Sequence, residues 1–260
     1  MAERIGIIGL GKMGEAIARS LYARTQSQVF GYDPFTKTRQ PFVSYQNSIA
    51  DLEAVADVLV VAVKPADVTK VLGECKQPKV FLSIAAGISV ETMQSASPKG
   101  SQVVRMMPNL PLLVGKGAIG YFTTSKLDDL VSSVFFGLGL LVKVDKEAHL
   151  DAITGLSGSG PAFVLSFLQG LAEGGLKEGL TYSQSLDLAL QTIEGSISYF
   201  KHLKEEDPNI HPMEVRNWVT SPAGTTIHGL DALERAGFMT AVRDAVASAT
   251  NRSRELGKGG

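Results

Sequence analysis

The sequence predicts an α/β fold: an N-terminal, Rossmann-like doubly wound sheet followed by an all-helical dimerisation domain. Three observations predict it. Short β-branched strands alternate with helical segments over the first half of the chain. A glycine-rich turn follows the first strand and opens the first helix. Beyond Lys146 helical patterns continue without strands. The predicted domains are therefore 1–146, the Rossmann domain, and 147–260, the helical domain.

The elements of the first half follow from local composition. Fully apolar strands such as Val58–Val63 suit a parallel sheet that is covered on both faces. Strands are predicted at Arg4–Ile8, Gln28–Tyr32, Val58–Val63, Lys79–Ser83 and Gln102–Met106. Helices are predicted at Lys12–Arg24, Ser48–Ala56, Ala66–Cys75 and Ser89–Ala96, and a strand–helix–strand passage over about 118–144 completes the sheet.

The second half is predicted to be helical throughout. Leu186, Leu190, Ile193 and Ile197 form an apolar stripe, and Thr181–Gln184 fits a capping box at the start of that helix. Several helices carry apolar residues on more than one face, which favours a homodimer. Helices are predicted at Ala148–Leu156, Pro161–Glu178, Tyr182–Lys204, Met213–Val219, Thr226–Ala236 and Phe238–Leu256, with a loose tail from Gly257 to Gly260.

Composition argues against several classes of function. The net charge of -1 provides no concentrated basic field for nucleic acid or an anionic membrane. The apolar runs are far shorter than the roughly 20 residues of a membrane helix, and we expect no secretory signal. The single cysteine, Cys75, forms no intrachain disulfide and is expected to pack in the core, which favours a cytoplasmic location. No metal-ligand spacing is present, so no metal is expected.

The glycine-rich turn predicts a dinucleotide-binding site. Gly9, Gly11 and Gly14 form G-x-G-x-x-G between an apolar strand and an amphipathic helix. Gly9 permits a tight turn, Gly11 lets the pyrophosphate approach the backbone, and Gly14 allows close packing of helix on strand. Lys12 and Met13 lie on the same turn, where free N–H groups and the helix dipole hold phosphates.

The second strand ends at Asp33, where a Rossmann acid usually binds the ribose hydroxyls of the adenosine. A carboxylate there favours NADH because it would repel a 2′-phosphate. Thr36, Lys37 and Arg39 follow closely and are suited to holding that phosphate. The cofactor is therefore expected to be NADPH or NADH, with the choice left open.

Three loops follow later strands of the sheet, where ligands of open α/β sheets bind. Their small residues let the backbone approach the nicotinamide end of a cofactor. Asn109 is suited to donate a hydrogen bond there. The residues expected to contact the cofactor are Ala62, Val63 and Lys64 in the first loop, Ala85 in the second and Asn109 in the third.

Two breaks rich in glycine, serine and threonine interrupt the helical half. The first, Gly155–Ala162, is expected to separate two helices. The second, Thr220–Thr226, precedes a helix whose N-terminus suits a carboxylate. Simple capping by serine or threonine explains it equally well. His228 lies on that helix, where a surface or core role is commoner than a catalytic one.

Motifs along the whole chain resemble those of pyrroline-5-carboxylate reductases. They are Ala-Val-Lys-Pro from Ala62, Ser-Ile-Ala-Ala-Gly from Ser83, Met-Pro-Asn from Met107, Leu-Ser-Gly-Ser-Gly-Pro-Ala from Leu156 and Ser-Pro-Ala-Gly-Thr-Thr-Ile from Ser221. The resemblance implies hydride transfer from NAD(P)H to the C=N bond of a cyclic imino acid, giving L-proline. It also implies a helical domain that intertwines with a second subunit, in a family where larger rings of dimers occur.

The resemblance also implies roles for individual residues. Gly9, Gly11 and Gly14 would bind the cofactor phosphates, and Asn47 would touch the adenosine side. Ser221, Thr225 and Thr226 would bind the carboxylate and ring nitrogen of the substrate, with Thr226 as the hydrogen-bond partner of the nitrogen. Ala62, Lys64, Ala85 and Asn109 would lie along the nicotinamide half.

This chain departs from the family pattern at two positions. Leu110 stands where the family usually has Thr, and Ala223 where it usually has Gly. Either change could alter affinity or select a related cyclic imino acid, and neither by itself argues for loss of activity. A β-hydroxyacid dehydrogenase is the rival enzyme, but it needs a lysine on the first long helix of the second domain, and Pro161–Leu176 has none. A non-enzymatic NAD(P)-binding regulator would leave both helical breaks unexplained.

Overall fold

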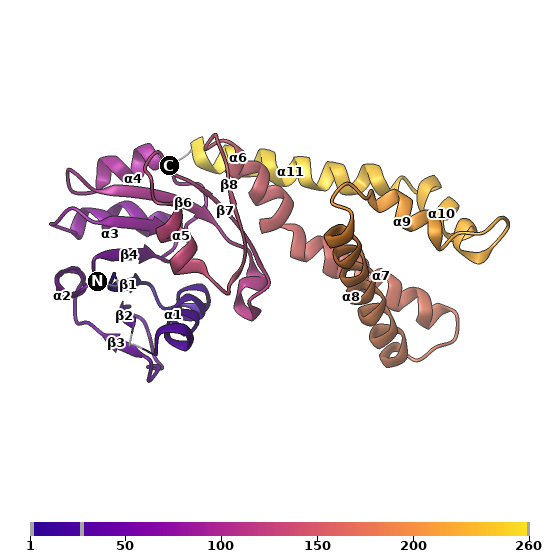
Figure 1. Cartoon of the computed structure of the whole chain (residues 1–260), viewed down its shortest axis with the longest axis horizontal. Helices are drawn as coiled ribbons and strands as arrows, with labels where there is room; N and C mark the ends of the chain where they lie inside the picture. Colours follow the sequence, from indigo (N-terminus) through magenta and orange to yellow (C-terminus); the bar gives the residue numbers. More distant parts are fainter. Residues whose placement is uncertain (1–2, 27–28, 259–260) are drawn as a thin grey trace. The chain divides into compact units, whose positions relative to one another are not determined.

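The computed structural model describes residues 3–26 and 29–258 (Figure 1). They form two compact units. The first unit contains the residues up to Pro161 and those from Val246 onward, and the second is Ala162–Ala245. The chain enters the second unit within α7 (Gly160–Lys177) and returns within α11 (Phe238–Lys258). The boundary predicted between 146 and 147 lies just after the last strand. The two segments that connect the units, 147–161 and the part of α11 from Val246, belong to the first unit with the sheet.

The first unit is built on an eight-stranded sheet with the order β3-β2-β1-β4-β5-β6-β7-β8. The first six strands are parallel to one another, β7 runs antiparallel to β6, and β8 is parallel to β7. The strands are β1 (Ile5–Ile8), β2 (Val29–Tyr32), β3 (Val43–Tyr45), β4 (Val58–Val61), β5 (Val80–Ser83), β6 (Gln102–Met107), β7 (Gly117–Phe122) and β8 (Gly139–Lys143).

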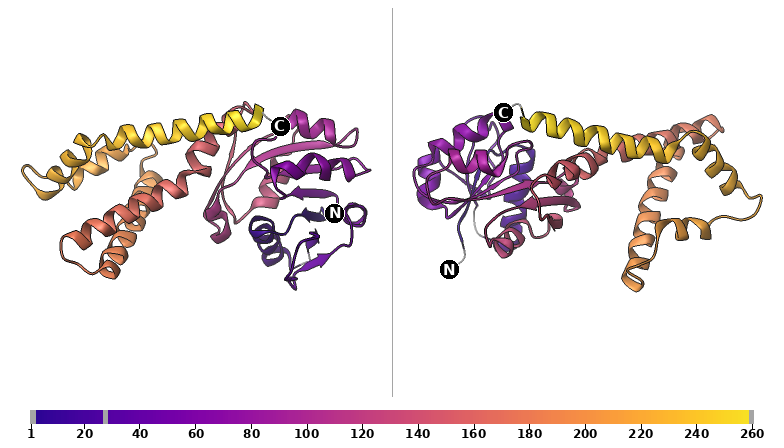
Figure 2. Two further views of the ribbon diagram at one scale, coloured as in Figure 1. Left: turned by 180° about the vertical axis from the view of Figure 1, so that it is seen from behind. Right: turned by 90° about the horizontal axis from the view of Figure 1, so that it is seen from above.

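Helices cover both faces of this sheet (Figure 2), as the apolar strands require. Each face of the sheet has its own hydrophobic core, and adjacent residues of one strand point into different cores. Ile7 packs with α1 and α5, and Ile8 packs with α2, α3 and α4. The helical segments of this unit are α1 (Lys12–Thr25), α2 (Ile49–Val55), η1 (Pro65–Asp67), α3 (Val68–Glu74), α4 (Val90–Ala96), η2 (Leu110–Val114), α5 (Asp128–Phe135) and α6 (His149–Ile153).

The predicted fold class and strand–helix alternation are confirmed. The structure adds a short edge strand, β3, and the 3₁₀ segment η2, neither of which was predicted. Gln28, the predicted start of the second strand, lies outside the described residues, as do Gly259 and Gly260 of the predicted tail. The capping box at Thr181 and Gln184 is confirmed by reciprocal hydrogen bonds.

The break predicted at Gly155–Ala162 takes the form of a π-helical turn, η3 (Thr154–Gly158), and a bend at Ser159, which together separate α6 from α7. The Ser159 N–H donates to the Thr154 carbonyl at 2.9 Å, which is the wider π-type bond. Gly155 lies against Thr250 of α11, and a Cβ there would stand 2.6 Å from the Val246 carbonyl oxygen. Tight packing against α11 therefore accompanies the π turn.

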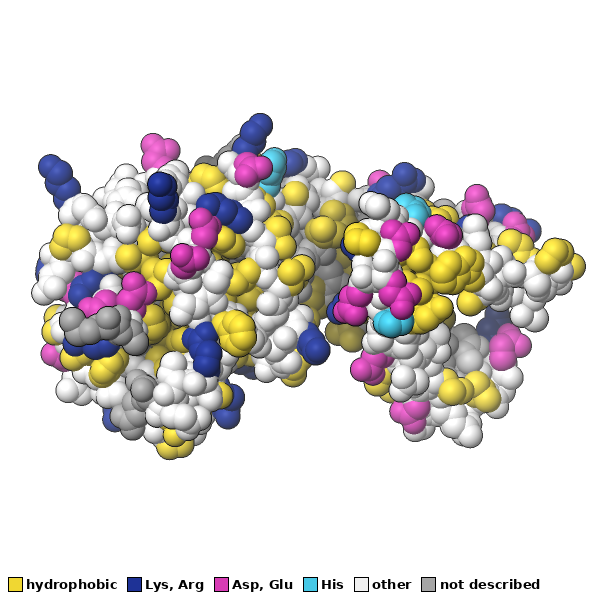
Figure 3. Space-filling model, in the orientation of Figure 1, with side chains coloured by type: hydrophobic (Ala, Val, Ile, Leu, Met, Phe, Trp, Pro, Cys, Tyr) yellow, Lys and Arg dark blue, Asp and Glu magenta, His cyan; other side chains and the backbone are white. Residues whose placement is uncertain are grey.

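The second unit contains most of α7, then α8 (Tyr182–Glu206), α9 (Pro212–Trp218), α10 (Thr225–Arg235) and the first part of α11. Within 162–245, which is described throughout, only Ala172, Ser185 and Ala189 are buried. Hydrophobic side chains instead gather on its surface (Figure 3). They include Val164, Leu165, Leu188, Leu190, Ile197, Trp218, Val219 and Met239. The expectation of helices with several apolar faces is confirmed.

Candidate functional site

The residues predicted to bind a cofactor gather at one edge of the sheet. Each follows one of the six parallel strands, whose carboxyl ends lie along the same edge. They are Gly9 after β1, Asp33 after β2, Asn47 after β3, Ala62, Val63 and Lys64 after β4, Ala85 after β5 and Asn109 after β6. The topology therefore brings residues far apart in the sequence to one edge of the sheet.

The glycine turn has the shape that a bound pyrophosphate requires. Gly9 has φ +92°, and a Cβ there would lie 2.7 Å from the Ala62 carbonyl oxygen. A Cβ on Gly14 would collide with the Gly9 carbonyl oxygen. Nothing lies within 4 Å of a Cβ built on Gly11, so the chain leaves open space beside that residue. Two glycines are thus needed for packing, and Gly11 leaves room for a ligand.

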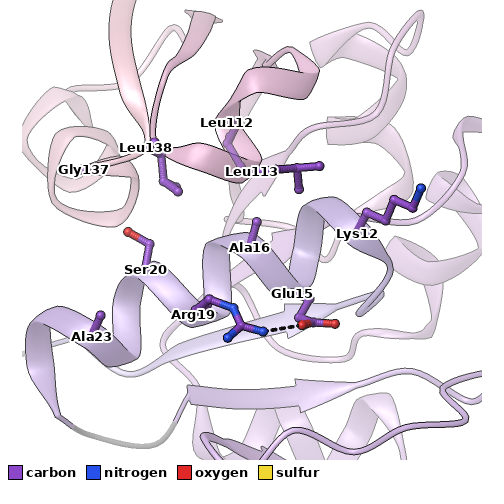
Figure 4. A pocket seen from close by; sticks show the side chains of 11 residues that line it. Lys12, Glu15, Ala16, Arg19, Ser20, Ala23, Leu112, Leu113, Gly137 and Leu138 are labelled. Carbon is purple, nitrogen blue, oxygen red and sulfur yellow. Dashed lines mark hydrogen bonds and ion pairs between the residues drawn. The ribbon is translucent and has the colours of Figure 1, made fainter. Parts of the chain in front are cut away.

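The start of α1 has N–H groups free for an anion. Its N-cap is Gly11, which provides no side-chain cap, whereas α2 and α4 are capped by Ser48 and Ser89. Lys12 begins the helix, at one end of a groove of about 360 Å³ between α1 and η2 (Figure 4). Along that groove Arg19 pairs with Glu15 at 2.7 Å, so its charge is already compensated.

Asp33 links the second strand to the glycine turn. Its Oδ2 accepts a hydrogen bond from the Leu10 N–H at 2.7 Å, and its Oδ1 accepts one from the Phe35 N–H at 2.8 Å. Each carboxylate oxygen retains a second lone pair. Asp33 therefore fixes the turn, and its contact with a ribose stays a prediction.

Two cations lie on the loop beyond Asp33. Lys37 is exposed, and the Arg39 guanidinium stacks over the Tyr45 ring at 5.0 Å from its centroid. Asn47 is exposed between β3 and the cap of α2. These positions suit the adenosine end of a dinucleotide, and their contacts with it stay a prediction.

Asn109 is nearly buried, at 9% exposure, and both the nitrogen and the oxygen of its side-chain amide form hydrogen bonds. Its Nδ2 donates to the Ser157 carbonyl at 2.9 Å, and its Oδ1 accepts from the Ala118 N–H at 2.8 Å. Asn109 therefore joins the end of β6 to β7 and to η3. One N–H of the amide is left for a ligand, so its predicted cofactor contact stays a prediction. Leu110 beside it is 57% exposed.

Sequence reasoning missed an ionic network centred on the buried Arg105 of β6, whose two carboxylate partners are half-buried. Its guanidinium lies 2.9 Å from Glu147 and 3.8 Å from Asp151. Glu147 also accepts from the Val90 N–H, and Asp151 accepts from the Ser253 hydroxyl of α11. The network ties the start of α4, residues 147–151 and the C-terminal part of α11 to the sheet. The only sequence signal was an arginine inside an apolar strand.

The bend Thr220–Thr226 carries unused hydrogen-bonding groups. Gly224 is the N-cap of α10 and provides no side-chain cap. In the described part of the chain, the hydroxyls of Ser221, Thr225 and Thr226 have no hydrogen-bond partner. The Thr220 hydroxyl, by contrast, donates to the Asn217 carbonyl at 2.7 Å. These hydroxyls therefore do not cap α10, which was the alternative interpretation of the sequence.

Ala223 forms the corner of this bend in the left-handed region, with φ 56°. The Gly224 N–H closes the turn onto the Ser221 carbonyl at 3.0 Å. His228 Nδ1 lies 2.9 Å from the Gly224 carbonyl oxygen, so its ring takes part in the helix start.

Other chemistry has little support among the described residues. Cys75 is buried, and burial first, then the charges of Glu53 and Glu74, raises the pKa of its thiol to about 12. Such a thiol is inert. The described side chains include no group of three His, Cys, Asp or Glu that could hold a metal. No described helix is long and apolar enough to cross a membrane.

Comparison with family models places the chain among known proteins. Residues 147–256 match the model described as pyrroline-5-carboxylate reductase dimerisation, and residues 4–87 match one described as NADP oxidoreductase, coenzyme F420-dependent. Among curated relatives, the pyrroline-5-carboxylate reductase of Methanosarcina acetivorans is 37% identical over 98% of each chain. Mouse pyrroline-5-carboxylate reductase 3 is 37% identical over 98% of this chain and 97% of that one.

Solved structures agree with the sequence relatives. The Plasmodium falciparum pyrroline carboxylate reductase with NADP bound is 30% identical, with a TM-score of 0.85 over 98% of both chains. The Coxiella burnetii pyrroline-5-carboxylate reductase is 28% identical, with a TM-score of 0.88 over 98% of this chain and 99% of that one. Relatives of this identity and coverage leave no support for the β-hydroxyacid dehydrogenase alternative.

Proposed function

The chain belongs to the pyrroline-5-carboxylate reductase family, and from that premise we propose that it reduces the C=N bond of 1-pyrroline-5-carboxylate to give L-proline. The observation that carries the proposal is a pair of helix starts without side-chain caps. One opens α1 after the glycine turn, and the other opens α10 beside three unpartnered hydroxyls. The first suits a pyrophosphate and the second a small carboxylate.

The dinucleotide fits the residues at the carboxyl edge of the sheet. The open space at Gly11 admits the phosphates, and the free N–H groups of Lys12 and Met13 hold them. The loops that contain Ala62–Lys64 and Ala85 flank the nicotinamide half. NADPH or NADH, when bound, supplies the hydride. Lys37 and Arg39 are the groups that a 2′-phosphate would meet.

The bend holds the imine. The N–H groups at the start of α10, with the hydroxyls of Ser221 and Thr225, bind the carboxylate. Thr226 hydrogen-bonds the ring nitrogen and turns the C=N carbon toward the hydride donor. A protonated imine is already electrophilic, so the main task is alignment at about 3–3.5 Å. The reaction adds a hydride to carbon and leaves the proton on nitrogen.

Thr226→Ala tests this role. Removing a hydrogen bond to a charged group costs about 1.5–3 kcal/mol, so kcat/KM for the imine should fall about 10- to 100-fold. Affinity for NADPH, measured by its fluorescence, should stay unchanged. Thr220→Ala is the matched control, because that hydroxyl already donates to the Asn217 carbonyl at the end of α9. Equal kinetics for Thr226→Ala and the parent would refute the assignment.

We further propose a cytoplasmic homodimer that can assemble into larger rings of dimers. The support is the second unit, which buries only three residues and carries the match to a dimerisation model. A second copy would cover its exposed apolar side chains. The cofactor on one chain would then meet a bend of its own chain or of its partner. The single, buried Cys75 suits a reducing compartment.

A further inference from the structure

A cavity of about 480 Å³ lies beside the loops that follow β4 and β5, within the first unit. Pro65 and Ala66 form one wall, and Ala86, Gly87 and Ile88 form another. The remaining walls come from the π turn with the serine that follows it, and from the last turns of α11. The loops after β4 and β5 are the ones that flank the nicotinamide half in the function proposed above.

Four polar side chains line this cavity, and three of them have a hydrogen-bond or ion-pair partner within the chain. The Thr154 hydroxyl donates to the Leu150 carbonyl at 2.8 Å, and the Ser253 hydroxyl donates to Asp151 at 2.7 Å. The Arg252 guanidinium pairs with Glu255 at 2.8 Å. The fourth is the hydroxyl of Ser159, which has no hydrogen-bond partner in the part of the chain that the structure describes.

The π turn separates the roles of the two serines of Leu-Ser-Gly-Ser-Gly-Pro-Ala. The Ser157 hydroxyl donates to the Ile153 carbonyl at 3.1 Å, and the Ser157 carbonyl accepts from Asn109. Ser157 is thus consumed in holding the turn. The Ser159 N–H closes the π turn onto Thr154, which leaves its side chain on the cavity. π turns of this kind occur often at functional sites.

We propose that the Ser159 hydroxyl binds the carboxamide of the nicotinamide ring. The inference rests on the proposed function, because it places the ring between the loops after β4 and β5. A hydroxyl can donate to the carboxamide oxygen or accept from its N–H, whereas the bend already accounts for the substrate carboxylate. Anchoring the carboxamide fixes the rotation of the ring, and so the direction in which its hydride-bearing carbon points.

Ser159→Ala and Ser157→Ala form a matched pair two residues apart on one turn. Dissociation constants are measured for NADPH and for 2′-phospho-ADP-ribose, which lacks the nicotinamide ring. Ser159→Ala should weaken NADPH about 10-fold, as expected for one lost hydrogen bond of roughly 1.4 kcal/mol, and leave 2′-phospho-ADP-ribose within about 2-fold. Ser157→Ala should leave both constants within about 2-fold of the parent, since its hydroxyl faces the helix backbone.

Two results would overturn the inference while sparing the proposed function. One is an unchanged NADPH constant in Ser159→Ala. The other is an equal loss for both ligands, which would mean that the substitution distorts the site as a whole. A parent protein that binds neither ligand would instead overturn the proposed function itself, and this inference with it.

Discussion

Ala223 holds a backbone conformation that L-residues avoid. Its φ of 56° lies in the left-handed region, which costs a non-glycine residue roughly 1–2 kcal/mol. A glycine at this position would remove that cost in the folded state. Part of the gain would be offset, because glycine also increases the conformational entropy of the unfolded chain. We expect Ala223→Gly to raise the free energy of unfolding by about 0.5–1 kcal/mol, measured by urea denaturation at one protein concentration.

Ala232→Gly is the control for this change. Ala232 lies in the interior of α10, where glycine lowers stability by about 1 kcal/mol. The two substitutions should therefore move the unfolding midpoint in opposite directions. A loss of stability in Ala223→Gly would mean that the bend is not left-handed in solution.

Single residues also show where sequence reasoning ends. The positions of Asp33 and Asn109 at strand ends followed from the motif and the strand pattern. Their partners did not, because the Leu10 N–H and the Ser157 carbonyl reach them only through the folded turn and η3. Likewise, only the structure shows that the hydroxyls of Ser157 and Ser159, identical in type, have different surroundings.

Close packing of η3 on α11 is a property of whole elements. A Cβ on Gly155 would meet the backbone of Val246 at 2.6 Å and of Thr250 at 2.8 Å, and neither can move without shifting α11. Gly155→Ala should therefore lower the free energy of unfolding by about 1–3 kcal/mol.

Gly73→Ala on α3 is the matched control for Gly155→Ala. A Cβ at Gly73 would meet only the Ala96 carbonyl oxygen, at an ordinary 3.9 Å. This change should leave stability equal or raise it by up to about 1 kcal/mol, through helix propensity. Equal effects of the two alanines in urea melts would contradict the close contact.

Long periodic elements were predictable, and short ones were not. The strands β1, β4 and β5 have continuous apolar runs, whereas β3 has only Val43–Tyr45 and gains its order from pairing with β2. The reversal of β7 follows from its connection: η2 is too short for the crossover that parallel strands need. The π turn depends on Gly155 meeting α11, a contact between residues distant in sequence.

At the scale of the whole molecule, the two units have different means of stabilisation. The sheet unit has two cores of its own, one on each face. The helical unit exposes Leu165, Leu190, Ile197 and many other apolar side chains, an arrangement that marks an association surface. The sequence predicted those apolar faces from helical periodicity. Periodicity does not tell what covers them, whereas residues 147–256 match a family model described as pyrroline-5-carboxylate reductase dimerisation.

The most direct test of the central claim follows the hydride itself. The fraction whose solution mass equals two chains is incubated with pyrroline-5-carboxylate and with NADPH or NADH deuterated at the transferring position of the nicotinamide. We predict proline with one deuterium on the ring carbon that belonged to the C=N bond, formed in proportion to the cofactor oxidised. Cofactor that binds to this fraction without transferring deuterium to the imine would contradict the account.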